Sequence, residues 1–322
     1  MKSVFFLFVL LLVFSTKAQE NINYRLPSQE ILALADFERA PSVSMDTKKE
    51  FMLLSYRNTY KTLDDLNQEE IRLGGLRINP ITNISSTMSY INNLKIRKIS
   101  NKTEAQVSGL PKNPKIANIS WSPNEQKIAF TNTTNTGVEL WFINVVSAEA
   151  KKITEDNLNA NLGSPYNWMI DNETLLVKVL PKNRPALIDV KKDLPKGPTI
   201  MLSDGSKSQN RTYPDLLKNK VDEDNFDALV TSELYKVSLS GALELFKTQA
   251  IYTGESYSPD GNYLLLTTIK KPYSYIVPLS RFPQTTTVYD NSGKEIKVVN
   301  EVPLSEIMPK GFSSVRKGKR NM

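Results

Sequence analysis

A turn-and-strand unit recurs along this chain and constrains its fold more than any other feature. The clearest copy is Trp121-Ser122-Pro123-Asn124-Glu125, followed by the apolar stretch 127–131, and a second is Tyr257-Ser258-Pro259-Asp260-Gly261, followed by 263–267. Because proline fixes φ while asparagine and glycine tolerate a left-handed backbone, each copy predicts a turn between two strands. The aromatic residue ends the first strand, and a buried strand follows at once.

Two looser copies and the spacing extend this pattern. They are 168–173, leading into 174–177, and 44–46, leading into 51–54. Trp168 follows Trp121 by 47 residues, and Tyr257 follows Trp168 by 89, close to twice that distance. A period of about 40 to 50 residues with four short strands is typical of propeller blades. The sequence predicts an all-β fold, a partial propeller, open or closed, of about four to five four-stranded blades. An ordinary β-sandwich with coincidental turns is the alternative.

Two segments depart from this β pattern. Pro27 and Ser28 make a plausible helix start, so we expect a short N-terminal helical segment over 28–37. The copy missing from the period falls near residue 212, and there we expect a helical insertion over about 211–228.

The first 18 residues are typical of a signal peptide. Lys2 precedes an unbroken apolar stretch over 4–14, and the small residues Thr16 and Ala18 favour cleavage between Ala18 and Gln19. An uncleaved N-terminal anchor is the alternative. In both cases we expect an exported protein, periplasmic or extracellular. If the leader is cleaved, we expect no stable membrane span, because no later stretch is apolar for about 20 residues.

Charge distribution argues against a nucleic-acid partner. The expected parts after the leader are an N-terminal extension (19–42), the propeller portion (43–309) and a basic C-terminal tail (310–322). Of the net charge of +7, two positive charges lie in the leader and five in the tail. The net charge of residues 19–309 is therefore zero. A nucleic-acid interface needs a basic face, which this balance does not predict.

The chain contains no cysteine and no histidine. A thiolate nucleophile, a disulfide framework, a Ser-His-Asp triad and the usual imidazole metal sites are therefore excluded. Ser-Lys dyads need no histidine, and Ser147 with Lys151 and Ser206 with Lys207 are close in sequence. Serine and lysine are common on protein surfaces, so neither pair is expected to be catalytic.

Two segments with acidic residues could suggest a functional site, but each has a simpler structural interpretation. The run over 222–227 could supply a carboxylate pair, but beside Lys218 and Lys220 we interpret it as a solvated helix face. The segment 290–294 begins like a calcium loop without the oxygen ligands that must follow, so it predicts a hairpin turn. We therefore expect no catalytic, cofactor or metal residue in this chain.

Four longer stretches, in this order, carry a family resemblance: 73–80, 132–141, 211–219 and 273–283. With the turn units, they resemble the N-terminal region of exported bacterial serine peptidases of the prolyl oligopeptidase family. The branch is the one that includes the glutamyl endopeptidase-like enzymes of plastids. This resemblance implies a propeller that precedes an α/β-hydrolase domain carrying Gly-x-Ser-x-Gly, then Asp, then His.

The chain departs from that family pattern in its chemistry. It has no Gly-x-Ser-x-Gly, and the nearest strings, at 204–206 and 311–314, lack the second glycine. The resemblance therefore implies a non-catalytic propeller portion, truncated before the hydrolase domain, which gates peptide access in a full-length secreted peptidase. Peptide substrate is expected as a partner only in that context. A free-standing TolB-like propeller that binds partners in the cell envelope is the alternative, and a stable, soluble monomer would favour it.

Three residues are candidate substrate contacts. Arg211, Tyr213 and Arg281 lie in the stretches most similar to the family. An arginine facing an acidic side chain forms a charge-assisted and often bidentate contact. A structural role is the alternative for each of them.

Overall fold

The structure, a computed structural model, describes residues 26–37, 39–189 and 213–306. The chain divides into two compact units, Met1–Glu38 and Arg39–Met322. The described part of the first unit contains helix α2 (Gln29–Ala35), which lies within the helix predicted over 28–37. The predicted leader with its cleavage site at Ala18 and Gln19, and the basic tail over 310–322, lie outside the described residues.

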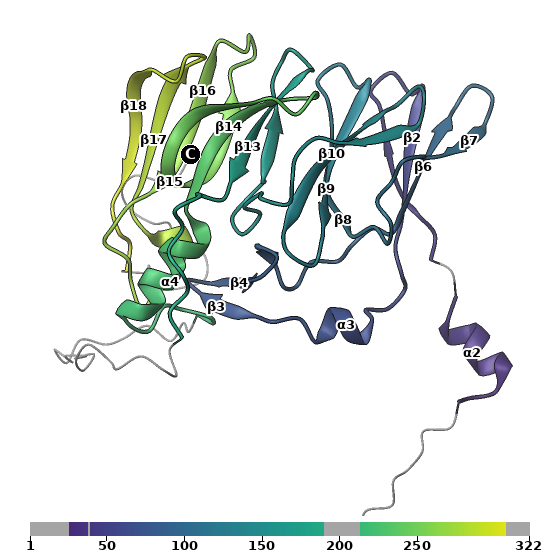
Figure 1. Ribbon diagram of the computed structural model, residues 1–322, viewed down its shortest axis with the longest axis horizontal. Coiled ribbons are helices and arrows are strands. Elements are labelled where there is room, and N and C mark those ends of the chain that lie inside the picture. Colours follow the sequence, from purple (N-terminus) through teal and green to yellow (C-terminus); the bar gives the residue numbers. More distant parts are fainter. Residues whose placement is uncertain (1–25, 38, 190–212, 307–322) are drawn as a thin grey trace, which may run out of the picture. The chain divides into compact units, whose positions relative to one another are not determined.

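The second unit is built from antiparallel sheets (Figure 1). Two of them have four strands each and form blades 1 and 2. Blade 1 has the order β1 (Ser42–Met45), β2 (Phe51–Tyr56), β6 (Asn93–Lys98) and β7 (Thr103–Gln106). Blade 2 has the order β8 (Ile116–Trp121), β9 (Lys127–Thr133), β10 (Val138–Asn144) and β11 (Glu149–Lys152).

A curled seven-stranded sheet makes blades 3 and 4. Its order is β12 (Tyr166–Trp168), β13 (Thr174–Val179), β14 (Ser232–Ser238), β15 (Leu243–Tyr257), β16 (Tyr263–Ile269), β17 (Gln284–Asp290) and β18 (Glu295–Val302). The 15-residue strand β15 pairs with β14 up to Ala250 and with β16 from Ile251 onward. It is therefore the last strand of blade 3 and the first strand of blade 4. The four blades that the described residues form in chain order confirm the predicted propeller class and exclude the β-sandwich.

The turn between the first two strands has the same geometry in all four blades, as the recurring unit predicts. Its fourth residue has a positive φ and donates its backbone N–H to the carbonyl of the first residue, at 2.8–3.2 Å. Only one of these fourth residues is glycine, so three blades hold a larger residue in the left-handed region. The donor–acceptor pairs are Lys49 to Asp46, Glu125 to Ser122, Asn172 to Met169 and Gly261 to Ser258.

The uneven spacing of the repeats comes from the connections between second and third strands. Blade 2 uses the short turn 134–137, whereas blades 1, 3 and 4 insert residues 57–92, 180–231 and 270–283 there. Because antiparallel strands alternate in direction, these insertions all leave the end opposite the tight turns. They contain α3 (Leu63–Leu66), a small sheet of β3 (Ile71–Leu73), β4 (Leu76–Asn79) and β5 (Ile84–Ser85), α4 (Lys220–Val230) and the 3-10 turn η1 (Leu279–Arg281). Figure 1 shows α3, β3, β4 and α4 together below the blades.

The predicted helical insertion is confirmed, but its bounds were wrong. Helix α4 begins at Lys220, whereas 213–219 is irregular and 211–212 lie outside the described residues. The backbone before the helix explains this late start. Pro214 disfavours a helical conformation in the residue before it, and Asp215 has a φ of 60°, in the left-handed region.

The N-terminus of α4 is set by a side-chain cap. The side chain of Asn219 accepts a hydrogen bond from the backbone N–H of Asp222 at 2.9 Å. Asparagine is among the residues preferred at this position, because its side-chain oxygen satisfies an N–H that has no partner within the helix. Asn219 therefore fixes the residue at which the helix begins.

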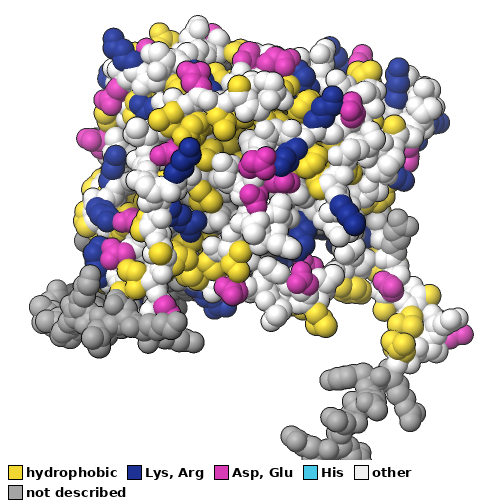
Figure 2. Space-filling view, viewed as in Figure 1, with side chains coloured by type: hydrophobic (Ala, Val, Ile, Leu, Met, Phe, Trp, Pro, Cys, Tyr) yellow, Lys and Arg dark blue, Asp and Glu magenta, His cyan; other side chains and the backbone are white. Residues whose placement is uncertain are grey.

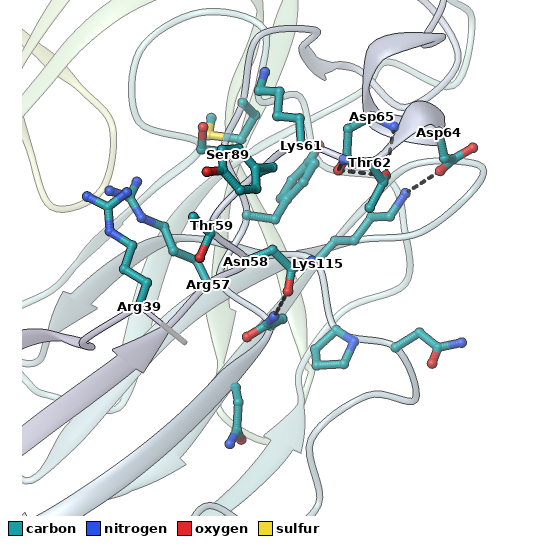
Figure 3. Close-up of a pocket in the computed structure, with 17 residues that line it drawn as sticks. Arg39, Arg57, Asn58, Thr59, Lys61, Thr62, Asp64, Asp65, Ser89 and Lys115 are labelled. Carbon is teal, nitrogen blue, oxygen red and sulfur yellow. Dashed lines mark hydrogen bonds and ion pairs between the residues drawn. The ribbon is translucent and has the colours of Figure 1, made fainter. Parts of the chain in front are cut away.

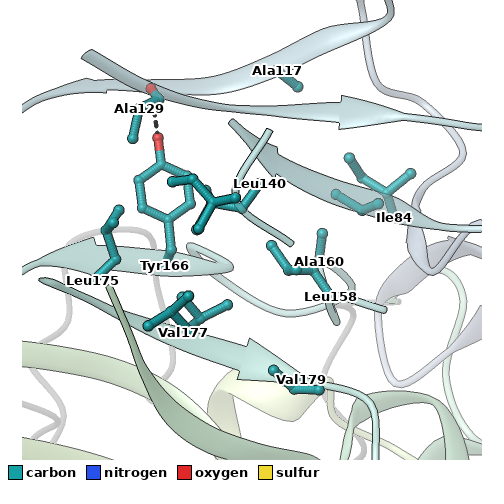
Figure 4. Packing of buried hydrophobic residues seen from close by; sticks show 13 residues of the cluster. Ile84, Ala117, Ala129, Leu140, Leu158, Ala160, Tyr166, Leu175, Val177 and Val179 are labelled. Carbon is teal, nitrogen blue, oxygen red and sulfur yellow. Dashed lines mark hydrogen bonds between the residues drawn. The ribbon is translucent and has the colours of Figure 1, made fainter. Parts of the chain in front are cut away.

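Each junction between neighbouring blades encloses its own apolar cluster. Leu53, Ile96 and Phe130 lie between blades 1 and 2. Leu140, Tyr166 and Val177 lie between blades 2 and 3, as Figure 4 shows. Leu176, Leu264 and Leu266 lie between blades 3 and 4. Burial of these side chains from successive blades supplies the main stabilisation of the arc.

Figure 2 shows the charged surface of one face, where acidic and basic side chains are interspersed among apolar and neutral ones. This distribution agrees with the balanced charge calculated for residues 19–309. No helix of the described ranges is both long enough and apolar enough to cross a bilayer.

A buried tyrosine ties blade 3 to blade 2. Strand β8 bulges at residues 118–119, where its register against β9 shifts and Asn118 has a φ of 49°. The bulge removes the Asn118 carbonyl from the ladder, and the hydroxyl of Tyr166 donates to that oxygen. The same hydroxyl lies 2.8 Å from the carbonyl oxygen of Ala129 and accepts from Ser120 Oγ at 3.1 Å. Burial raises the pKa of Tyr166 far above its ordinary value.

Tyr166→Phe is expected to lower the free energy of unfolding by about 1–3 kcal/mol, because it leaves the Asn118 carbonyl without its donor and Ser120 Oγ without its acceptor. The matched control is Tyr263→Phe, since the Tyr263 side chain is 46% exposed. Urea unfolding of the three proteins measures the difference. Equal stability of Tyr166→Phe and Tyr263→Phe would show that this hydroxyl does not tie the blades.

Candidate functional site

The three insertions pack into one body, here called the insertion module (57–92, the described parts of 180–231, and 270–283). Its apolar core joins Leu73 and Ile78 from the first insertion, Phe226 and Leu229 from the second, and Phe282 from the third. Phe226 meets Tyr273 and Phe282 edge to face, with ring centroids 5.2 and 6.0 Å apart. Aromatic pairs at these distances add to the stabilisation from burial alone.

The Gly74-Gly75 turn is the point where all three insertions meet. Gly75 donates its N–H to the carbonyl of Asp215 at 2.8 Å, and the carbonyl of Gly74 accepts from Leu279 N–H at 2.8 Å. Both glycines have positive φ, 61° and 91°. A Cβ on Gly74 would lie 3.1 Å from the Phe226 ring, so a larger residue would crowd that ring at a φ that already strains residues with a Cβ.

Salt bridges reinforce the same junction. Arg77 Nε lies 2.8 Å from Asp215 Oδ2, and Arg72 Nη1 lies 3.7 Å from Asp215 Oδ1. The Asp215 side chain is only 10% exposed, so it is shielded from solvent more than its partners are. The Asp215 carboxylate, through its hydrogen bond, is the main cause that raises the pKa of Arg77.

Acidic side chains of α4 bind the third insertion. The prediction that the run over 222–227 is a solvated helix face was therefore wrong in part. The hydroxyl of Tyr273 donates to Asp227, and the hydroxyl of Tyr275 donates to Glu223 at 2.8 Å. Lys271 Nζ lies 2.6 Å from Asp227 Oδ2. Burial, followed by the hydrogen bond to a carboxylate, raises the pKa of both tyrosines. The carboxylates of Glu223 and Asp227 therefore hold the third insertion against α4 through hydrogen bonds and an ion pair.

The blade 2–blade 3 connection caps the other end of α4. The side-chain amide of Asn159 donates to the carbonyls of Leu229 and Thr231, both at 3.0 Å, and that of Asn161 donates to Leu229 at 2.7 Å. The last carbonyls of a helix have no partner within the helix, so these asparagines satisfy them. The caps fasten the insertion module to the blades.

The structure describes two of the three predicted substrate contacts, and both belong to the insertion module. Tyr213 is half-buried and packs on its apolar core. Arg281 is half-buried, its N–H donates to Pro278 at 2.9 Å, and its carbonyl accepts from Ser305 at 3.0 Å. Both of these Arg281 contacts are made by its backbone, whereas Nη1 of its side chain is buried without a hydrogen-bond partner in the described part of the chain. The predicted substrate contacts and their structural alternatives therefore stay as predictions. Arg211 lies outside the described residues.

The first insertion also lines a pocket of about 680 Å³, here called the cationic pocket (Figure 3). Its walls come from Arg39, which precedes β1, the two ends of the first insertion and the blade 1–blade 2 connection. Because β1 pairs with β2 from Ser42 opposite Ser55, residues just before β1 lie beside residues just after β2. The cationic side chains of the lining are Arg39, Arg57, Lys61 and Lys115, and the acidic ones are Asp64 and Asp65.

Both acids of the cationic pocket already have partners. Lys115 Nζ lies 3.3 Å from Asp64 Oδ2. Asp65 accepts from the N–H and the hydroxyl of Thr62 at 3.0 and 2.8 Å, in a capping box that begins α3. Burial opposes ionisation of Asp65, but those hydrogen bonds and the charges of Lys115 and Lys61 outweigh it and lower its pKa.

Sequence reasoning missed the cationic pocket. Its residues come from four separate segments with no shared motif, and only the β1–β2 register and the insertion bring them together. The run Arg57-Asn58-Thr59-Tyr60-Lys61, polar and directly after a buried strand, was the one local signal.

The remaining candidates from the sequence are the two Ser-Lys pairs and the segment 290–294. Those that the structure describes make local structural contacts. Lys151 Nζ lies 3.7 Å from Glu149, and Ser147 donates its N–H to the side chain of Asn144. Ser206 and Lys207 are not among the described residues. Residues 290–294 form the predicted hairpin turn, with Gly293 at a φ of 83° and its N–H donating to Asp290. Within the described ranges, no three acidic side chains converge as metal ligands would.

Comparison with known proteins agrees with the resemblance seen in the sequence. Residues 83–179 match the family model for the dipeptidyl peptidase IV N-terminal region. The chain is 35% identical over 315 residues to a protein named "Probable glutamyl endopeptidase, chloroplastic" from Oryza sativa subsp. japonica. It is 34% identical to the protein of the same name from Arabidopsis thaliana.

These alignments cover 94% and 93% of the chain but only 33% and 32% of the relatives. The chain therefore spans about a third of the length of these relatives. Among solved structures, Pyrococcus horikoshii acylaminoacyl peptidase matches with 13% identity and a TM-score of 0.45, over 84% of this chain and 33% of that one. The predicted similarity to the propeller region of glutamyl endopeptidase-like peptidases is confirmed by the family model and the two relatives.

Gly74→Ala is expected to lower the free energy of unfolding by about 1–3 kcal/mol, because it adds left-handed strain and crowds Phe226. The matched control is Gly254→Ala, where φ is not positive and the nearest atoms lie 3.9 Å from the new Cβ. Urea unfolding measures both. A Gly74→Ala protein as stable as the control would contradict the role assigned to this turn.

Proposed function

We propose that this chain is the non-catalytic propeller portion of a secreted serine peptidase of the prolyl oligopeptidase family, in its glutamyl endopeptidase-like branch. In this proposal the propeller limits which peptides reach an active site on a separate α/β-hydrolase domain. The alignment of almost the whole chain with a third of a glutamyl endopeptidase carries the proposal.

The composition of the chain supports a non-catalytic role. A Ser-His-Asp mechanism needs a base, and the chain has no histidine and no Gly-x-Ser-x-Gly. The relatives are about three times as long, so they have ample sequence to hold an α/β-hydrolase domain. We place the nucleophile, the acid and the base in that part of the full-length peptidase.

The insertion module supports a gating role. Three of the four family-like stretches, 73–80, the described part of 211–219 and 273–283, contribute to this one body. It covers the end of the blades opposite the short, repeated turns, where connections are free to vary in length. A body anchored at its core and at the cap of α4 is suited to limit the size of peptides that pass it.

The proposed location is outside the cytoplasm. The predicted leader over 1–18 supports export, with cleavage between Ala18 and Gln19. The name of each relative places it in the chloroplast, a compartment that is also reached by a targeting segment.

The purified chain is expected to show no peptidase activity, since it lacks the groups that attack a peptide bond. The assay follows a fluorogenic glutamyl peptide and labelling by a serine-directed fluorophosphonate. Turnover above the buffer blank that the fluorophosphonate abolishes would contradict the proposal.

Gating is tested in a chimera where this chain replaces the aligned third of the Arabidopsis thaliana relative. The chimera is expected to cleave a short glutamyl peptide and leave a folded protein intact, because the propeller restricts entry. Deleting the aligned third is the matched comparison. If the deletion protein discriminates between peptide and folded protein as well as the chimera does, the chain has no gating role.

A further inference from the structure

Two arginines of the cationic pocket have no counter-charge among the described residues. Arg39 is exposed and Arg57 is half-buried, and neither makes an ion pair or side-chain hydrogen bond within the described ranges. Figure 3 shows both side chains on the same wall of the cavity, apart from α3 and its two acids. This contrasts with Arg72, Arg77 and Arg97, which all pair with a carboxylate.

The neighbouring acids do not neutralise this wall. Asp64 pairs with Lys115, and Asp65 is held by Thr62 in the capping box. Lys61, the remaining cation, donates to the carbonyl of Thr87 at 3.3 Å, and its positive charge acts on Asp65, whose pKa it helps to lower. Two guanidinium groups on one wall repel each other, and an anion bound between them would remove that repulsion.

We propose that Arg39 and Arg57 bind a carboxylate carried by a peptide. A guanidinium presents parallel N–H donors that match the two oxygens of a carboxylate, so two of them can hold one anion by several charge-assisted hydrogen bonds. The carboxylate belongs either to an acidic side chain or to the free C-terminus of the peptide. The site needs no other part of a peptidase.

The rest of the lining favours a peptide over a compact polyanion. Asn58 and Asn92 offer amide donors and acceptors of the kind that a peptide backbone needs. Asn92 and Asn58 are oriented by their own hydrogen bond of 2.6 Å. The negative charge of Asp64 and Asp65 in the same cavity disfavours a multiply charged ligand. The choice of a peptide as carrier rests on the proposed function.

The test titrates the purified chain, labelled with ¹⁵N at asparagine, and follows the side-chain amides of the pocket. Four probes separate the sources of the anion. They are acetyl-Gly-Gly-Glu-Gly-amide, the same peptide with Gln for Glu, acetyl-Gly-Gly-Gly with a free carboxylate, and sodium glutarate. The variants are Arg39→Gln/Arg57→Gln and, as control, Arg97→Gln on strand β6, which removes the same kind of charge outside the pocket.

At least one carboxylate peptide is expected to bind the wild-type chain at low salt and to bind the double variant about tenfold more weakly, with Arg97→Gln unchanged. Binding of the Glu but not the free-carboxylate peptide assigns an acidic side chain, and the reverse assigns a C-terminus. The proposal is overturned if the Gln peptide binds as tightly as the Glu peptide, or if Arg97→Gln weakens binding as much as the double variant does. It is also overturned if glutarate binds and neither carboxylate peptide does. The chimera assay measures hydrolysis and size selection, whereas the titration measures carboxylate binding by the chain alone. The proposed function and the carboxylate site can therefore fail independently of each other.

Discussion

The close approach of the Gly74-Gly75 turn to Phe226 and Leu279 is the contact on which the rest of the insertion face depends. It joins parts of the chain 140 residues or more apart through two backbone hydrogen bonds, and it places the turn against the Phe226 ring. A residue with a Cβ would crowd the Phe226 ring and would be strained at this positive φ. With that contact in place, Asp215 meets Arg77, and α4 packs between the first and third insertions.

The two ends of the blades therefore have different physical characters. One end repeats a single hydrogen-bonded turn in every blade, which leaves little room for variation. The other end holds the insertion module, the asparagine caps of α4 and the cationic pocket. We propose that binding and selection take place at this second end, because long connections supported by a packed scaffold can be shaped without disturbing the blades.

Local patterns in the sequence predicted the blades well, because each turn depends on residues within about five positions of one another. The repeat identified β8–β9, β12–β13 and β15–β16, and Gly293 marked the β17–β18 hairpin. The start of α4 was misplaced because Asn219, not the family-like stretch before it, begins the helix. The role of Glu223 and Asp227 and the cationic pocket could not be predicted, because both depend on contacts between distant insertions.

Native-state hydrogen exchange tests the central claim, that three insertions form one cooperative body. The amide of Gly75 bonds to the second insertion, and the amide of Leu279 bonds to the first. If the module opens as one unit, both amides exchange with the same opening free energy, as does the backbone amide of Phe226 inside α4. Different opening free energies for the three amides would contradict the account, because each insertion would then fold on its own blade.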